Sequence, residues 1–264
     1  MRNTLLISLN TLRETLRQKL MLIVALVAFA LVISSKYLLS LDLGHEQLRF
    51  IFDFGSGALG FFGSIIAVVA TCQIFHSEIE NKTVITLLSK PVGFPQFTVG
   101  KFFGAAMALA LFASIIAAAT CAMLFVTRLG FGESAARLSA GLDTNYAGVA
   151  AFAFVQWIKL CAIASVSALV CSVSTSLLFS VIVSFMILAI SMAGELTLWL
   201  GGKSEGFVKI VSYVFPDFHV FNAAEIFAFD PVDLPQFAAA CAYGIIYAAA
   251  ALACASILFS KREF

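Results

Sequence analysis

The amino-acid sequence predicts an all-α integral membrane protein with six transmembrane helices. Hydrophobic residues make up 61% of the 264 residues and charged residues only 12%, against about 45–50% and about 25% in soluble domains. Six apolar stretches are long enough to cross a hydrocarbon core of about 30 Å, which takes roughly 20 helical residues. These spans belong to a single transmembrane domain, residues 1–264, and lie near residues 20–41, 54–75, 102–127, 147–171, 177–200 and 236–259.

Residues 1–19 precede the first span and are predicted to form an amphipathic helix. One face holds leucines at helical spacing: Leu5, Leu9, Leu12 and Leu16. Another face holds charged or polar side chains: Arg13, Glu14, Arg17 and Gln18. A basic helix of this kind is expected to lie in the inner interface of the membrane. A cleaved signal peptide is the alternative, but no small-x-small cleavage site follows Ile33.

The distribution of Lys and Arg predicts the orientation in the membrane. With six spans, the N-terminus, residues 76–101, residues 172–176 and the C-terminus lie on one side, with nine basic and four acidic residues. The opposite side holds six basic and eleven acidic residues. The positive-inside rule therefore places both termini in the cytoplasm of a multi-pass protein in the cell membrane, the inner membrane of a bacterium.

Several function classes are not supported. A net charge of +1 gives no basic footprint for nucleic acid. The six cysteines lie inside apolar runs without a CxxC pair, so they are expected to pack between helices rather than to bind metal or form disulfides. The histidines lie in different segments and no HExxH motif occurs. We therefore expect no metal, no cofactor and no catalytic site.

The cytoplasmic segment that follows the second span is predicted to form a short amphipathic helix. Ser77 and Glu80 match a capping box that would begin a helix there, and Pro91 should end it near Ser89. Its apolar face carries Val84, Leu87 and Leu88, and its polar face carries Glu78, Asn81, Lys82 and Ser89. Such a helix suits docking to a soluble partner, and an interfacial connector without a partner explains the same pattern.

The same segment resembles the ABC-2 type permease family, the membrane subunits of type-2 ATP-binding-cassette exporters. It reads EIENKTVITLLSKPVGFPQFTVGKFFG, and the matching positions are Glu78, Glu80, Thr83, Leu87 to Val92, Gly100, Lys101, Phe102 and Gly104. The stretch from Phe215 to Asn222 and the basic tail also resemble the family. Within it, the chain is most similar to the multi-copper-enzyme-maturation permeases.

The resemblance implies a transport subunit that binds no nucleotide itself. A separate cytoplasmic ABC ATPase would dock on the coupling helix, whose contact residues would be Glu78, Glu80, Lys82, Thr83, Leu87, Lys90 and Pro91. A second permease copy or a paralogue would complete the transporter as a dimer among membrane lipids, and ATP hydrolysis would export an unidentified substrate. Independently, the Walker-like string at Gly202 lacks its leading glycine, because Thr197 stands there. The alternative function is a non-transporting membrane anchor or assembly subunit of an envelope or respiratory complex.

Two charged residues are candidates inside the membrane. Lys159 lies midway along the fourth span, where a charge costs about 2.5–3.5 kcal/mol on insertion scales. It is expected to line the translocation path or to pair across the bundle; alternatively, the span begins near Phe152 and Lys159 snorkels to the outer surface. Glu195, with Trp199 one turn later, is interpreted as a rim carboxylate in preference to a gating residue.

The outer segment 201–235 is too apolar for a free loop and predicts short interfacial or re-entrant helices before the last span, broken at Pro216. The family resemblance implies that such helices cap the path, and simple interfacial packing is the alternative. The candidate cap residues are Pro216, Phe218, Phe221 and Asn222. In the second span, Gly57, Gly60 and Gly63 are expected to permit close helix contact.

Overall fold

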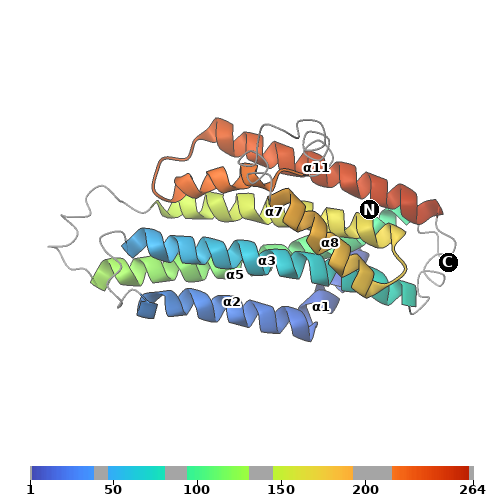
Figure 1. Ribbon diagram of the computed structural model, residues 1–264, viewed down its shortest axis with the longest axis horizontal. Helices are drawn as coiled ribbons and strands as arrows, with labels where there is room; N and C mark the ends of the chain where they lie inside the picture. Colours follow the sequence, from blue (N-terminus) through green and yellow to red (C-terminus); the bar gives the residue numbers. More distant parts are fainter. Residues whose placement is uncertain (1, 39–46, 81–93, 131–144, 193–215, 262–264) are drawn as a thin grey trace, which may run out of the picture.

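The computed structural model describes residues 2–38, 47–80, 94–130, 145–192 and 216–261, which form a bundle of helices (Figure 1). These residues contain no β-strand, so the predicted all-α class is confirmed for them. In chain order the elements are α1 (Arg2–Leu16), α2 (Lys19–Leu38), α3 (Gln47–Glu80), α5 (Phe94–Gly130), α7 (Tyr146–Val173), α8 (Leu177–Met192), the 3₁₀ helix η2 (Phe218–Ala228) and α11 (Leu234–Lys261).

Five of these helices are long and apolar enough to cross a membrane. They correspond to the first, second, third, fourth and sixth predicted spans and comprise Lys19–Tyr37, Leu48–Ser77, Pro95–Leu129, Tyr146–Val173 and Leu234–Lys261. The predicted fifth span, 177–200, is described only over α8, an apolar helix of 16 residues. Its last part, with Glu195, lies outside the described residues. The chain is therefore a multi-pass membrane protein, and the sixth crossing stays a prediction.

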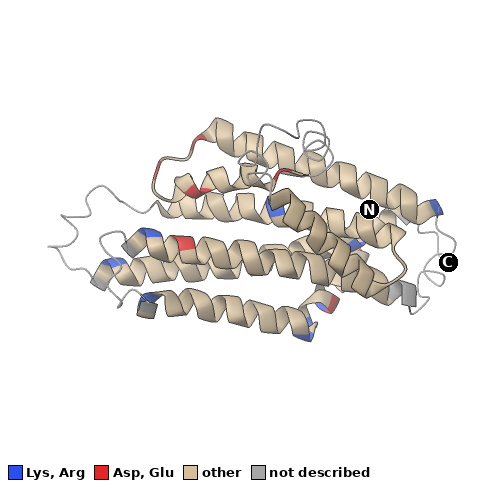
Figure 2. Cartoon of the chain, viewed as in Figure 1, with Lys and Arg blue, Asp and Glu red and all other residues tan. Residues whose placement is uncertain are grey.

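The long helices run side by side along the bundle (Figure 1). α7 packs against α3, α5 and α11, while α8 crosses obliquely and contacts α3 and α7. The first residues of α1 and the last residues of α11 lie at the same end, which we call the terminal end. Charged residues gather mainly toward the two ends of the bundle (Figure 2), as expected when the middle of each long helix faces hydrocarbon or other helices.

The N-terminal helix is amphipathic, and of its predicted apolar face Leu12 packs against the buried core, while the closest contact with the bundle is made by small polar residues. Leu5, Leu6 and Leu9 are exposed, whereas the buried face consists of Ser8, Thr11 and Thr15. This face packs on α5 at Gly104, where a Cβ would lie 2.7 Å from the Ser8 carbonyl oxygen, while Ile7 and the Thr4 carbonyl lie against Gly100. Small residues on both helices therefore allow a close approach, and the exposed leucines remain turned outward, as an interfacial helix requires.

The capping-box prediction at Ser77 is wrong. α3 continues through Ser77 to Glu80, so no new helix begins there. The hydroxyl of Ser77 lies 3.2 Å from both the carbonyl oxygen of Ile74 and the Glu14 Oε1 atom of α1, and it can donate its one proton to either. The physical reason is that extending an existing helix is more favourable than nucleating another, and buried Phe75 and His76 hold this last part of α3 in the bundle.

The prediction about the glycines of the second span is correct for one of three. A Cβ at Gly63 would lie 2.8 Å from Leu160 on α7, so this glycine does permit close contact. Among the described residues, nothing lies within 4 Å of such a Cβ at Gly57 or Gly60, so these two glycines do not serve a close contact between the described helices. The regular spacing of three residues misled the interpretation, because successive positions turn by about 300° and drift away from one contact face.

Candidate functional site

Lys159 lies buried near the middle of α7, with only 4% of its surface exposed. It follows Tyr146, the first residue of α7, by 13 positions and precedes Val173, the last, by 14. At 1.5 Å per residue it is about 20 Å from either helix end. The alternative in which α7 begins later and Lys159 snorkels to the surface is therefore wrong, because the side chain points into the bundle at mid-depth.

The partner of Lys159 is Asn222 on η2. The Lys159 Nζ atom donates to Asn222 Oδ1 at 3.2 Å. The sequence alone predicts separate roles for the two residues: Lys159 is a candidate inside the membrane, and Asn222 belongs to an outer cap. The structure brings them together although they are 63 positions apart, so η2 packs into the bundle and contacts its interior through a polar residue.

Contacts at both ends of η2 hold Asn222 in place. At its start, the Asp217 side chain accepts from the backbone N–H of His219 at 2.9 Å, a normal helix cap. The backbone N–H of Asp217 in turn donates to the Tyr243 hydroxyl of α11 at 2.8 Å. At its end, the backbone N–H of Asn145 donates to the carbonyl of Ala228 at 2.9 Å. η2 is therefore fixed to α11 at one end and to the start of α7 at the other.

The predicted cap residues form the apolar side of η2. Phe218 is 3% exposed and Phe221 is completely buried, and Pro216 just before η2 is buried too. Phe221 packs against Tyr243, with ring centroids 6.0 Å apart, and lies close to Gly244, which leaves space for it on α11. These residues explain why η2 is buried; whether they close a transport path stays a prediction.

Gln156 and Glu225 add polar groups near Lys159 that sequence reasoning missed. Gln156, one turn before Lys159 on α7, is 3% exposed, and its Oε1 atom has no hydrogen-bond partner in the described part of the chain. Partial burial, and then the Asp53 carboxylate, raise the pKa of Glu225, while the Lys159 ammonium opposes this shift. Two polar residues one helical turn apart within an apolar span, Gln156 and Lys159, were visible in the sequence and could have indicated a polar site there.

A second polar contact lies at the terminal end of the bundle. Glu14 of α1 accepts from Lys101 Nζ of α5 at 3.2 Å and from the hydroxyl of Ser77 on α3 at 3.2 Å. The Lys101 side chain is 3% exposed and the Glu14 side chain 35%. We call this contact the clasp. It joins three helices near the places where α3 ends and α5 begins.

Most of the predicted ATPase-docking residues cannot be placed. Glu78 and Glu80 form the last turn of α3. The others, Lys82, Thr83, Leu87, Lys90 and Pro91, lie outside the described residues. The clasp is therefore the described feature that lies nearest in sequence to the predicted docking segment.

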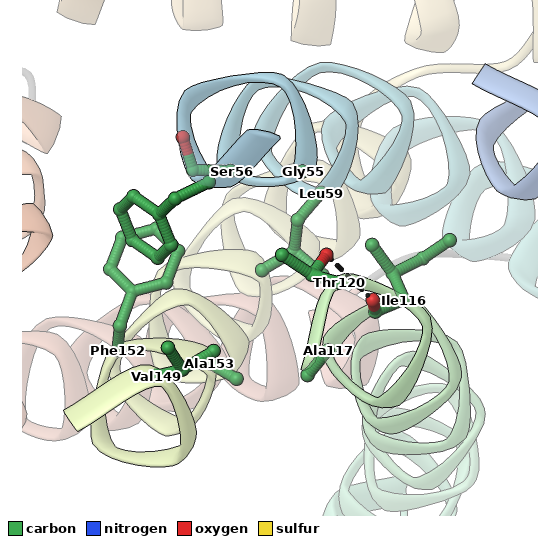
Figure 3. A pocket seen from close by; sticks show the side chains of 10 residues that line it. Gly55, Ser56, Leu59, Ile116, Ala117, Thr120, Val149, Phe152 and Ala153 are labelled. Carbon is green, nitrogen blue, oxygen red and sulfur yellow. Dashed lines mark hydrogen bonds between the residues drawn. The ribbon is translucent and has the colours of Figure 1, made fainter. Parts of the chain in front are cut away.

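A small pocket among α3, α5 and α7 offers no room for a substrate (Figure 3). The volume open to a water-sized sphere is about 10 Å³, which suffices for about one water molecule. Its walls include Phe52, Leu59 and Phe152, and the hydroxyl of Thr120 donates within its own helix to Ile116 at 2.9 Å. The pocket is a local packing gap without free polar groups directed at a ligand.

The described residues contain no group of three His, Cys, Asp or Glu side chains that could hold a metal ion. In comparisons with known proteins, no family model matches the chain and no curated protein is significantly similar to it. The two polar contacts, one buried at mid-depth and one at the terminal end, are therefore the observations on which a functional interpretation depends.

Proposed function

We propose that this protein is the membrane-spanning permease subunit of an ABC exporter, driven by a separate cytoplasmic ATPase. In this proposal the ATPase docks on the segment between α3 and α5, two permease subunits pair in the membrane, and both termini are cytoplasmic. The observation that carries it is the clasp of Glu14 with Lys101 and Ser77, together with the lengths of α3 and α5.

The two helices next to the docking segment are longer than a membrane requires. α3 has 34 residues and α5 has 37, or about 51 and 56 Å at 1.5 Å per residue. A hydrocarbon core is about 30 Å thick, so both helices extend well beyond it. Because α1 is clasped to both, a force applied where α3 and α5 are connected would reach the membrane through three linked helices.

The charges at the terminal end fit a cytoplasmic location. The ends of α1 and α11 and the starts of α2 and α5 bring Arg13, Arg17, Lys19, Lys101 and Lys261 to this end, against the acidic Glu14, Glu78 and Glu80. Basic residues near span ends are enriched on the cytoplasmic side of membrane proteins. This orientation would put the docking segment in the compartment that holds ATP.

The buried Lys159 favours transport over passive anchoring. An ionisable side chain at mid-depth is costly, and such residues commonly mark the route of a substrate or an ion. A membrane anchor could use an apolar residue at this position without that cost. The pairing of Lys159 with Asn222 connects such a route to η2, the candidate cap.

The docking part of the proposal is tested by site-specific crosslinking in the native host. A photo-crosslinking residue at Glu78 should capture a protein with ATP-binding-cassette motifs, whereas the same residue at Asp233, at the opposite end of the bundle, should not. Affinity purification that recovers no ATPase, with no crosslink from Glu78, would refute this proposal and favour the anchor or assembly subunit.

The transport part is tested by Lys159→Leu in proteoliposomes with the recovered ATPase. We expect substrate-stimulated ATP hydrolysis to be lost, while Lys36→Leu, which removes an exposed lysine, leaves it unchanged. Normal folding together with unchanged activity of Lys159→Leu would show that Lys159 does not act in the path.

A further inference from the structure

The polar groups around Lys159 have hydrogen-bonding capacity that the described residues do not use. A lysine ammonium has three N–H groups, and one of them binds Asn222. The amide of Gln156, 3% exposed, has an oxygen without a partner. Because a glutamine amide can turn over, the same position can present its NH₂ donors. Buried polar groups without partners cost free energy, so a ligand that accepts hydrogen bonds would be stabilised here.

Ser191, near the end of α8, is as far along its helix from the α7–α8 link as Lys159 is. The two helices are joined by the short link 174–176 and α8 crosses obliquely. Lys159 lies 14 residues before Val173, and Ser191 lies 14 residues after Leu177, so each is about 21 Å from the link. Ser191 is 5% exposed and its hydroxyl has no partner in the described part of the chain. α8 also contacts η2, so this hydroxyl belongs to a helix that packs on the element carrying Asn222.

Lys159, when protonated, has an amide oxygen rather than a carboxylate as its close partner. Lys101 and Glu14 form an ion pair within 4.0 Å, whereas Lys159 forms none with a carboxylate of the described residues. The nearest carboxylate that influences Lys159 is Glu225 on η2, and it forms no such pair with Lys159. A buried cation without a bound anion is unfavourable, and a charge-assisted bond to an oxyanion is the strongest way to satisfy it.

We propose that Lys159, Gln156 and Ser191 form a mid-membrane binding site for an oxyanion, a carboxylate or phosphate group, of the substrate. This inference rests on the proposed transport function and adds the chemical class of the cargo. Asn222 orients the ammonium, because its Oδ1 atom holds one of the three N–H groups.

The test is a binding measurement with the full chain in nanodiscs of zwitterionic phosphatidylcholine, without ATPase or ATP. The probes are dodecyl phosphate, laurate and inorganic phosphate, with dodecyltrimethylammonium as the cationic control. We expect the anionic probes, and not the cation, to bind the wild type by calorimetry. Binding of inorganic phosphate would show that the oxyanion arrives from water, and binding of only the dodecyl compounds that it arrives from the bilayer.

Matched variants locate the binding. Lys159→Met should weaken it about tenfold or more, as the loss of a buried charge-assisted bond does, while Lys159→Arg should retain it and Lys36→Met should not change it. Gln156→Leu should weaken it several-fold. Glu225→Gln should tighten it, because the repulsion of the anion by a nearby carboxylate is removed. The last two variants leave Lys159 in place and remain informative if Lys159→Met does not fold.

Two outcomes would overturn the proposal. One is equal binding of the anionic probes by the wild type and Lys159→Met. The other is that the wild type binds none of the anionic probes. Because no ATPase takes part, loss of anion binding leaves the crosslinking result at Glu78 intact, so failure of this inference and failure of the transport proposal are distinguishable.

Discussion

Gly148→Ala is predicted to displace η2 from α7 and to weaken the contact between Lys159 and Asn222. A Cβ at Gly148 would lie 2.6 Å from the carbonyl carbon of Phe227 and closer still to its oxygen. Ordinary contact begins near 3.4 Å, so η2 must retreat by at least about 0.8 Å. Where such a shift lies along the Lys159–Asn222 direction, it would lengthen the 3.2 Å bond to about 4.0 Å, beyond hydrogen-bond distance.

The expected cost of Gly148→Ala is about 1–3 kcal/mol, as for other overpacked sites. It should appear as a melting temperature several degrees lower, measured in detergent by tryptophan fluorescence. Gly60→Ala is the matched control, because nothing lies within 4 Å of its new Cβ; it should be neutral or slightly stabilising. Asn222→Leu combined with Gly148→Ala should cost less than the sum of the two single changes, since both remove the same bond.

Equal melting temperatures of Gly148→Ala and Gly60→Ala would refute the close packing of η2 on α7. Strict additivity of Gly148→Ala with Asn222→Leu would refute the mechanism, because it would mean that the hydrogen bond to Lys159 survives the displacement. Together these results would separate the position of η2 from the role of its asparagine.

Three further predictions concern the clasp, the packing of α1 against α5 at Gly104, and Glu225. Glu14→Gln should destabilise the protein by about 1–3 kcal/mol, since it removes the charge that pairs with buried Lys101; unchanged thermal unfolding would show that the clasp is not stabilising. Gly104→Val should release α1 from α5, because even a Cβ there would lie 2.7 Å from the backbone of α1, and faster proteolysis of residues 2–16 would reveal it. Partial burial, and then the Asp53 carboxylate, raise the pKa of Glu225, so the folded protein holds this proton more tightly than the unfolded chain. The free energy of unfolding should therefore be highest below the ordinary pKa of glutamate and decrease as the pH rises through the raised pKa. In a plot of melting temperature against pH, Glu225→Gln should remove this decrease.

The positions of the membrane helices could be predicted closely from the sequence. The predicted fourth span, 147–171, corresponds to Tyr146–Val173, and the sixth, 236–259, to Leu234–Lys261. The reason is local: an apolar run of this length in a membrane must satisfy its own backbone hydrogen bonds, and a helix does so within the segment. The ends were less predictable, as α3 and α5 show, because tertiary contacts extend a helix beyond its apolar run.

The candidate site could be predicted only in part. Lys159 was conspicuous as a single charge within an apolar span, and Asn222 belonged to a recognisable stretch, but nothing in the local pattern related them. Gln156 is also a polar residue in this apolar span, three positions before Lys159, but an uncharged amide does not stand out among apolar neighbours. The clasp was missed for a similar reason, because Glu14 and Lys101 are 87 positions apart.

What the sequence by itself determined is which segments enter the membrane and which face of α1 is apolar, since both depend on the periodic placement of apolar side chains. What only the tertiary structure decided is the rotation of each helix about its axis and its neighbours. That rotation turns Ser8, Thr11 and Thr15 toward α5 and Lys159 toward Asn222. The physical reason is that lipid and protein are similarly apolar, so hydrophobicity alone does not orient a helix within a bundle, and small residues and a few polar contacts do.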